Sequence, residues 1–180
     1  MRKLVLLAVA LFVATAAFSQ VNGNKDADFS SYYRGFVDAG WGVGQFNGDN
    51  KTEAFYGYRQ WICELSTTHG VQLTPEIFVG GGISMLRAFD VKESFFPVFG
   101  AARYSLTDIS VKPYAEARVG IIAFNSAKKE KVNRYYLAGS LGVELLPYLQ
   151  LGGRLSLFGL PNDKSAFCAS LFLALSFGAK

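Results

Sequence analysis

Residues 167–177 read Phe-Cys-Ala-Ser-Leu-Phe-Leu-Ala-Leu-Ser-Phe, near the end of the sequence. Side chains on a β-strand alternate between the two faces of the sheet, so every second residue shares a face. One face of this segment is apolar and consists of Phe167, Ala169, Leu171, Leu173, Leu175 and Phe177. Small or polar side chains make up most of the other face, namely Cys168, Ser170, Ala174 and Ser176. An apolar row that ends in an aromatic residue predicts a β-barrel strand that faces lipid.

The beginning of the sequence has the pattern of a secretory signal peptide. A basic start at Arg2 and Lys3 is followed by an apolar run over residues 4–14 and by small residues up to Ser19. A run of that length is typical of a signal peptide, whereas a membrane-spanning helix needs about 20 apolar residues. We therefore expect a signal peptide at 1–19, a flexible polar segment at 20–31 and a barrel domain at 32–178.

Alternating apolar and polar residues recur in eight segments of the remaining chain. They cover residues 32–46, 53–67, 75–89, 95–106, 112–124, 134–146, 148–159 and 166–178. The connections between them, such as Asn47-Gly48-Asp49-Asn50, Thr68 to Thr74 and Pro161-Asn162-Asp163-Lys164, are rich in turn-forming residues. Evenly spaced short strands with polar turns indicate an all-β barrel or sandwich. The prediction is an all-β fold, an eight-stranded antiparallel up-and-down transmembrane β-barrel.

Alternation alone does not separate a barrel in lipid from a barrel in water, but the distribution of side chains favours lipid. All ten lysines lie in the leader, in predicted connections or at strand ends, whereas a soluble sandwich would scatter lysines along its exposed faces. The apolar rows are fringed by aromatic residues, among them Tyr33, Trp41, Trp61 and Tyr148. Aromatic residues near both strand ends are expected at the two membrane interfaces. A secreted, lipocalin-like carrier with an apolar cavity is the less favoured alternative.

Charged residues in the middle of the strands predict a polar network inside the barrel. By the alternation, the inward-facing charges are Arg34, Asp38, Glu64, Glu76, Arg103, Glu116, Arg118, Glu144 and Arg154. We expect neighbour-strand pairs in the order Arg34–Glu64, Glu76–Arg103–Glu116 and Arg118–Glu144–Arg154, mostly in the periplasmic half. Because an eight-stranded barrel has just enough interior for side chains, a neutralised set of charges is expected to plug it. A gate that opens through alternative pairings is the second hypothesis.

Other candidate sites give weaker signals. The single histidine, His69, lies in a predicted turn, and one histidine without partners builds neither a catalytic triad nor a metal site. Gly80-Gly81-Gly82 lies within a predicted strand with no helix after it, so close approach of Phe78 or Phe99 is favoured over phosphate binding. We expect no catalytic, cofactor-binding or metal-binding residues.

Cysteine content and net charge exclude further classes. The two cysteines, Cys63 and Cys168, are expected on strands that are not neighbours, near opposite ends of the barrel, and as free thiols. Two of the 18 basic residues belong to the predicted leader, which leaves 16 against 14 acidic residues. That near balance argues against a nucleic-acid partner.

Outward-facing and loop cations are candidates for contact with the phosphates of lipopolysaccharide. They are Arg59, Arg87, Lys128, Lys129 and Lys131, of which Arg87 is expected near the extracellular rim. Such phosphates would accept charge-assisted hydrogen bonds from these side chains.

Three segments carry a resemblance to a known family. They are residues 66–82, which run from Ser-Thr-Thr-His-Gly to Pro-Glu-Ile-Phe-Val-Gly-Gly-Gly, residues 113–120 (Pro-Tyr-Ala-Glu-Ala-Arg-Val-Gly), and the final Leu-x-Leu-x-Leu-x-Phe at 171–177. The chain resembles small bacterial outer-membrane β-barrel proteins of the OmpA-transmembrane and OmpX type, especially versions common in Bacteroidota-like bacteria. The resemblance implies insertion by the outer-membrane insertion machinery, which reads the last strand, so Leu173, Leu175 and Phe177 are expected to act as an assembly signal.

The sequence therefore predicts an outer-membrane barrel with a structural or surface-interaction role and no enzymatic activity. Its expected partners are outer-membrane lipid, lipopolysaccharide and the insertion machinery, and we expect a monomer. A narrow porin-like channel or small-solute transporter is the alternative function.

Overall fold

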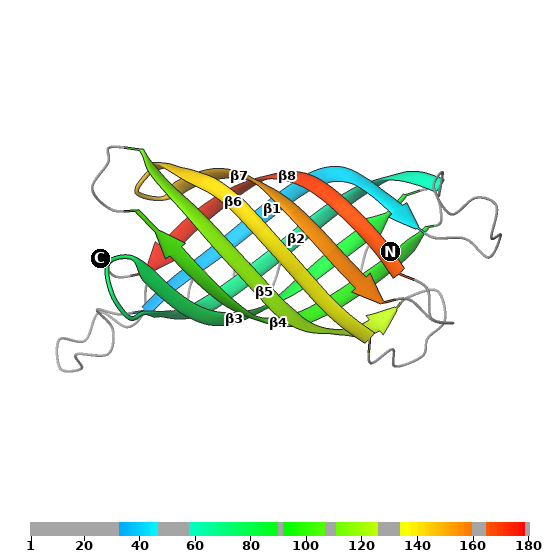
Figure 1. Ribbon diagram of the computed structural model, residues 1–180, viewed down its shortest axis with the longest axis horizontal. Coiled ribbons are helices and arrows are strands. Elements are labelled where there is room, and N and C mark those ends of the chain that lie inside the picture. Colours follow the sequence, from blue (N-terminus) through cyan, green and yellow to red (C-terminus); the bar gives the residue numbers. More distant parts are fainter. Residues whose placement is uncertain are drawn as a thin grey trace.

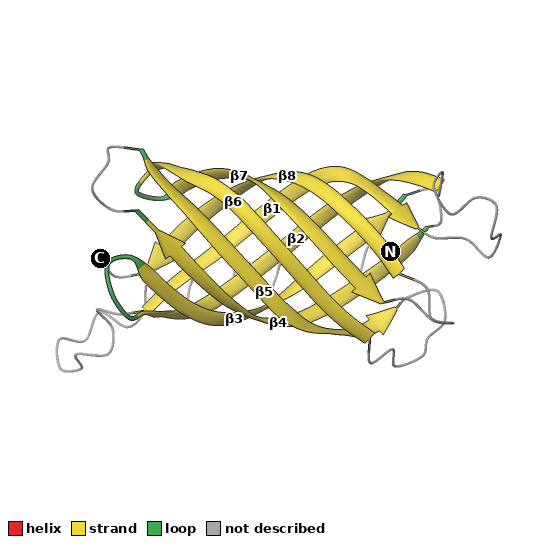
Figure 2. Cartoon of the chain, in the orientation of Figure 1, coloured by secondary structure: helices red, strands yellow, loops and turns green. Residues whose placement is uncertain are grey.

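The computed structural model describes residues 33–46, 58–89, 92–106, 111–125, 134–159 and 165–178. These residues form one closed antiparallel barrel in which the strands follow each other in sequence order (Figure 1). The strands are β1 (Tyr33–Phe46), β2 (Tyr58–Gln72), β3 (Ile77–Ala88), β4 (Glu93–Ser105), β5 (Lys112–Asn125), β6 (Arg134–Leu146), β7 (Leu149–Gly159) and β8 (Ser165–Gly178). Figure 2 shows strands and turns but no helix among the described residues.

Pairing between the first and last strands closes the barrel. Strand β1 pairs with β8 from Arg34 opposite Gly178 to Phe46 opposite Ala166. Closure leaves no strand with an unpaired edge, because every strand has two hydrogen-bonded neighbours. The predicted fold class, an eight-stranded antiparallel up-and-down barrel, is confirmed.

The described part of the chain has no helix that is both long and apolar enough to cross a membrane. Residues 1–32 lie outside the described residues, so the signal peptide at 1–19 and the flexible segment at 20–31 stay predictions.

Burial alternates along the strands as a period of two requires. In β4, every second residue from Phe95 to Ser105 is buried inside the barrel, while Val98, Gly100, Ala102 and Tyr104 are exposed on the outside. Strand β8 behaves in the same way: Leu171, Leu173 and Leu175 point outward and Phe172 and Ala174 point inward. Large apolar side chains therefore cover the outer surface, whereas the interior holds charged side chains together with buried aromatic and small ones.

Strand β2 ends later than the sequence predicts. The strand expected at 53–67 continues to Gln72, and the turn that follows is formed by residues 73–76 instead of 68–74, while residues 53–57 lie outside the described residues. Thr74 makes this turn, because its hydroxyl oxygen accepts hydrogen bonds from the backbone N–H of Glu76 (3.3 Å) and of Ile77 (3.1 Å). The placement of His69 in a turn was therefore wrong, since it lies within β2.

Glycines in β3 make room for aromatic rings inside the barrel. A Cβ atom on Gly80 would lie 2.7 Å from Cζ of Phe78, and one on Gly82 would lie 2.8 Å from Cζ of Phe99. Gly81, between them, points outward and is exposed. The expectation that this triplet permits close approach of Phe78 and Phe99 is confirmed.

A proline in β4 coincides with a break in the ladder. The register between β4 and β5 shifts between Phe96 and Pro97, so one extra residue of β5 is accommodated there. Proline has no N–H to donate, and within sheets it is found at such bulges.

The two cysteines are free and lie on opposite sides of the barrel wall. Cys63 on β2 pairs with Trp41 of β1, and Cys168 on β8 pairs with Gly44 of the same strand. Cys63 is half-buried on the outside, whereas Cys168 is buried in the interior. The expectation that they lie near opposite ends was wrong, because both flank β1 at positions only three residues apart.

Candidate functional site

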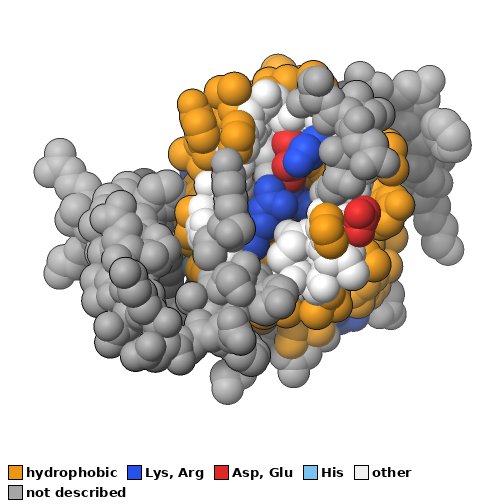
Figure 3. Space-filling view, turned by 90° about the vertical axis from the view of Figure 1, so that its left-hand side faces the viewer, with side chains coloured by type: hydrophobic (Ala, Val, Ile, Leu, Met, Phe, Trp, Pro, Cys, Tyr) orange, Lys and Arg blue, Asp and Glu red, His pale blue; other side chains and the backbone are white. Residues whose placement is uncertain are grey.

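The strongest concentration of polar chemistry lies inside the barrel. Eight of the nine predicted network residues point inward from strands: Arg34, Asp38, Glu64, Arg103, Glu116, Arg118, Glu144 and Arg154. They gather toward the end of the barrel that carries the turns at 73–76 and 147–148. Figure 3 looks into this end, where basic and acidic side chains occupy the mouth and hydrophobic side chains cover the outside.

Asp38 holds the centre of this network. Its Oδ2 accepts hydrogen bonds from Ser66 Oγ (2.6 Å) and Arg118 Nη2 (2.9 Å), and its Oδ1 accepts one from Arg154 Nη1 (2.8 Å). Arg154 also contacts Glu64 Oε1 at 3.1 Å. One carboxylate thus neutralises two arginines that come from distant strands, β5 and β7.

Glu116 is the second carboxylate shared by two arginines. Its Oε2 accepts from Arg103 Nη2 at 2.6 Å and Arg103 Nε at 2.9 Å, and its Oε1 accepts from Arg118 Nε at 2.6 Å. All three side chains are at most 1% exposed. Such charges persist without water only when each has good partners, as these do.

Two further contacts extend the network to the mouth of the barrel. Arg34 Nη2 donates to Glu144 Oε1 at 2.8 Å. Gln150 joins this outer pair to the inner one: its Oε1 accepts from Arg103 Nη1 at 2.7 Å, and its Nε2 donates to Glu144 at 3.1 Å. The polar contacts therefore run without interruption from Glu64 to Arg34.

Aromatic rings hold the guanidinium groups from the other side. Arg103 lies between the rings of Phe36 and Tyr114, with its Cζ 3.8 Å and 4.1 Å from the two ring centroids. Arg118 packs over Phe99 and Arg154 over Phe172, each with Cζ 4.6 Å from the centroid. Cation–π contacts of this kind are strongest where water is excluded. Each buried arginine is thus fixed both by carboxylates and by an aromatic face.

The observed pairs differ from most of the predicted ones. Arg103 pairs with Glu116 as expected, but Arg34 contacts Glu144, and Arg118 and Arg154 meet at Asp38. The expectation assumed partners on neighbouring strands. In this narrow interior, long arginine side chains instead reach across the barrel, as Arg154 of β7 does to Glu64 of β2.

Glu76 is the predicted network residue that lies elsewhere. It is part of the turn between β2 and β3, where its carboxylate accepts a hydrogen bond from the Thr74 hydroxyl at 2.9 Å. Sequence reasoning missed the neutral members Ser66, Ser84, Tyr136, Ser140 and Gln150, which bond to the charged groups. The alternation along the strands could have identified them, because each occupies an inward position of its strand.

The opposite half of the interior is mainly apolar. It is packed by Ile62, Leu86, Ala88, Phe95, Phe99, Ala101, Ile122, Tyr136, Ala138, Phe158, Ala166 and Cys168. Phe95 and Phe158 contact each other across the lumen with ring centroids 5.4 Å apart. Charged and apolar layers together fill the described interior, and this arrangement resembles a packed core rather than a pore.

His69 lies on the outer surface with two hydroxyl partners. Its Nδ1 is 2.6 Å from the Tyr33 hydroxyl and its Nε2 is 2.8 Å from the Thr67 hydroxyl. The ring of Phe177 packs beside it, with centroids 5.7 Å apart. No group of three or more potential metal ligands occurs among the described residues.

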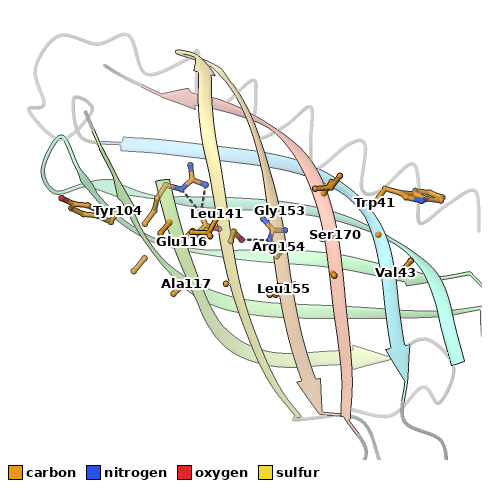
Figure 4. Close-up of a pocket in the computed structure, with 18 of the residues that line it drawn as sticks. Trp41, Val43, Tyr104, Glu116, Ala117, Leu141, Gly153, Arg154, Leu155 and Ser170 are labelled. Carbon is orange, nitrogen blue, oxygen red and sulfur yellow. Dashed lines mark hydrogen bonds and ion pairs between the residues drawn. The ribbon is translucent and has the colours of Figure 1, made fainter. Parts of the chain in front are cut away.

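The outer surface carries a hollow with a floor of small residues. Its volume is about 1200 Å³, and Figure 4 shows it extending between Tyr104 and Trp41, past Ala117 and Gly153. The hollow follows a line of registered partners across the strands, which runs through Tyr104, Ala115, Leu141, Gly153, Leu171 and Trp41. A lining this apolar suits hydrocarbon better than a polar ligand.

The candidate lipid contacts are only partly within the described residues. Arg87 lies on the outer face of β3, where its Nη1 donates to Ser94 Oγ at 2.9 Å. Arg59 belongs to β2, but its side chain lies outside the described residues, as do Lys128, Lys129 and Lys131. Of the expected assembly signal, Leu173 and Leu175 point outward, and Phe177 covers Gly35 of β1.

Comparison with known proteins finds similarity in structure only. No protein-family model and no curated protein matches the chain. Among solved structures, Neisserial surface protein A is similar with a TM-score of 0.54 and 16% identity, over 79% of this chain and 97% of that one. The outer-membrane enzyme PagL is similar with a TM-score of 0.54 and 18% identity, over 77% of this chain and 97% of that one. At such low identity the similarity concerns the fold, and the chain has the fold of the small eight-stranded outer-membrane β-barrels.

Proposed function

We propose that the protein is an integral protein of the bacterial outer membrane with a structural or surface-interaction role and a lumen plugged by ion pairs. The observation that carries the proposal is the distribution of side chains across the wall. Large apolar residues are most exposed on the outside, with Val119 at 63%, Leu141 at 71% and Leu171 at 72%, whereas the charged residues are buried inside. This distribution suits lipid outside and is the reverse of that in a water-soluble protein.

The same distribution argues against a secreted carrier. A lipocalin-like carrier would line its cavity with apolar side chains and expose charges to water. Here the strand carboxylates Asp38, Glu64, Glu116 and Glu144 all point inward. We therefore place hydrocarbon against the outer face and regard export through a cleaved signal peptide as part of the proposal.

The packed interior favours a plug over a channel. Each of the arginines 103, 118 and 154 touches at least one carboxylate and an aromatic ring, so an open path would require several contacts to break together. We propose that the lumen conducts neither ions nor solutes. The narrow channel is the second candidate, and measurement of conductance distinguishes it from the plug.

We further propose that the protein acts as a monomer without cofactor or catalytic activity. Its partners would be outer-membrane lipid, lipopolysaccharide and the insertion machinery. The residue nearest to a catalytic arrangement, His69, has hydroxyl neighbours but no carboxylate beside it among the described residues. The Tyr33–His69 hydrogen bond instead ties β1 to β2 on the outer surface.

Location and fold can be tested together. Cells that produce the protein are fractionated, and the outer-membrane fraction is analysed by gel electrophoresis with and without heating. The proposal predicts recovery in that fraction, extraction only by detergent, and a faster-migrating band in the unheated sample. A polypeptide that stays folded and monomeric in buffer without any amphiphile would contradict the proposal.

A further inference from the structure

Arg87 is unusual because it is a cation on the face that the proposed function assigns to lipid. It is the next-to-last residue of β3, and its registered neighbours are Cys63 on β2 and Ser94 on β4. Among the side chains that the structure describes, it is the one basic side chain on an outward-facing strand position. Its Nη1 donates a hydrogen bond to Ser94 Oγ at 2.9 Å, which uses one of the several N–H donors of the guanidinium group.

Three aromatic rings gather on the outer face beside Arg87. The ring centroid of Trp41 lies 6.2 Å from that of Trp61 and 5.3 Å from that of Phe89. Trp41 is the registered partner of Cys63, and the backbone N–H of Phe89 donates to the carbonyl of Trp61 at 3.1 Å. All three rings are exposed, with fractions of 53% for Trp41, 56% for Trp61 and 42% for Phe89.

The position along the strand places this group near a membrane surface. A tilted strand crosses the hydrocarbon in about 9–11 residues, and β3 has 12. Arg87 and Phe89 lie at its very end, beyond or at the edge of the hydrocarbon. Tryptophan and phenylalanine beside a cation are typical of the interface, where lipid phosphates lie.

We propose that Arg87, Trp41, Trp61 and Phe89 form a binding site for the phosphate headgroup of an anionic membrane lipid. The guanidinium group donates charge-assisted hydrogen bonds to the phosphate, and its fork geometry matches two phosphate oxygens. The aromatic rings contact the glycerol or sugar region and the upper acyl chain. The carboxylates of the interior network, Asp38, Glu64, Glu116 and Glu144, point to the other side of the wall. This inference rests on the proposed membrane location and names the lipid chemistry of that surface.

The two tryptophans of the chain are both in the site, so intrinsic fluorescence reports on it directly. The full mature chain is inserted into phosphatidylcholine vesicles that contain increasing fractions of phosphatidylglycerol, and tryptophan emission is recorded. We expect a saturable change for the wild type. In Arg87→Gln the half-saturating fraction of anionic lipid should rise about tenfold, because the charge-assisted contacts are lost. Arg87→Lys should lie between the two, since it keeps the charge without the fork.

Lys112→Gln is the matched control, because it removes one positive charge at the opposite end of the barrel. It should titrate like the wild type. Equal titration of Arg87→Gln and the wild type would overturn the proposal. So would a change in wild-type emission with millimolar inorganic phosphate in pure phosphatidylcholine vesicles that equals the change with phosphatidylglycerol, because the site would then bind a soluble anion. Protease protection in the same vesicles distinguishes failure of the proposed function from failure of this site. A chain that does not insert contradicts the proposed function itself. An inserted chain whose emission does not depend on anionic lipid contradicts only the lipid site.

Discussion

At the scale of single residues, two carboxylates organise the interior. Asp38 and Glu116 each bind two arginines, and Arg118 is shared between them. Removal of water from a charge costs several kcal/mol per ion, roughly, so each of these groups depends on its partners. Residues that serve two partners at once are therefore the positions where substitution is most damaging.

Arg118→Ala tests this dependence. The change removes the shared arginine, so Asp38 and Glu116 each lose a partner while still buried. We expect a loss of about 3–5 kcal/mol in the free energy of unfolding. Urea unfolding in lipid vesicles measures it. The control Lys92→Gln removes an exposed charge and should change stability by less than about 0.5 kcal/mol. Equal effects of the two changes would mean that the ion network adds little to stability.

Gly82→Ala probes the close packing behind the β3 glycines. A Cβ there would lie 2.2 Å from the carbonyl oxygen of Thr67 and 2.8 Å from Cζ of Phe99, so the ring and strand must shift. We expect destabilisation of about 1–3 kcal/mol. Gly139→Ala is the control, because a Cβ on that outward glycine meets nothing within 4 Å. Unfolding curves that coincide for the two variants would show that the Phe99 ring moves aside at little cost in free energy.

The sequence allows the members of the charged network to be predicted better than their pairing. Alternation assigns Arg103, Glu116 and Arg154 to the interior because facing depends only on the local period of two. Pairing depends on the stagger of all the strands, which brings Asp38 level with Arg154 although β1 and β7 are not neighbours. No local pattern encodes that stagger.

At the scale of strands, the number and order of elements follow from the sequence and the exact turn does not. Thr68, His69 and Gly70 look like turn residues, yet they continue β2, since Gly70 lies opposite Gly80 and leaves space for Phe78. Residues typical of turns can thus serve a strand when a large ring needs the room. The turn forms instead where Thr74 can bond the following backbone N–H groups.

Strand β8 supplies a prediction through Phe177. Its ring packs over Gly35, where a Cβ would lie 2.4 Å from Cε2, and beside Tyr33 and His69. We expect Phe177→Ala to destabilise the closed barrel by about 1–2 kcal/mol more than Phe167→Ala, which also removes an outward ring from β8. The fraction of fast-migrating, unheated protein after refolding measures closure. An equal fraction for both variants would mean that the contact does not help to close the barrel.

At the scale of the whole molecule, the interior has a charged layer and an apolar layer in series. A permeating ion would have to pass the Asp38 and Glu116 pairs and then the rings of Phe95 and Phe158. Either layer alone is a barrier, because the charges of one are paired with each other and the other is packed mainly with apolar side chains. With both layers in place, we expect the barrel to be closed to ions.

Planar-bilayer recording tests this closure. We expect no steps in current for the wild type, and none for Asp38→Asn, because the apolar layer stays in place in that variant. Reproducible conductance in Asp38→Asn alone would instead support a gate made by the ion pairs, and conductance in the wild type would support a channel.

The free thiols on either side of β1 give the molecule natural reporters of its two environments. Cys63 is half-buried on the outer surface, and Cys168 is enclosed in the interior. Because maleimide reacts with the thiolate, and a thiol against hydrocarbon stays protonated, a water-soluble maleimide should modify neither cysteine in the intact membrane and both after unfolding. The extent of alkylation at each cysteine in one mass spectrum would then report insertion at Cys63 and integrity of the barrel at Cys168, with no residue altered.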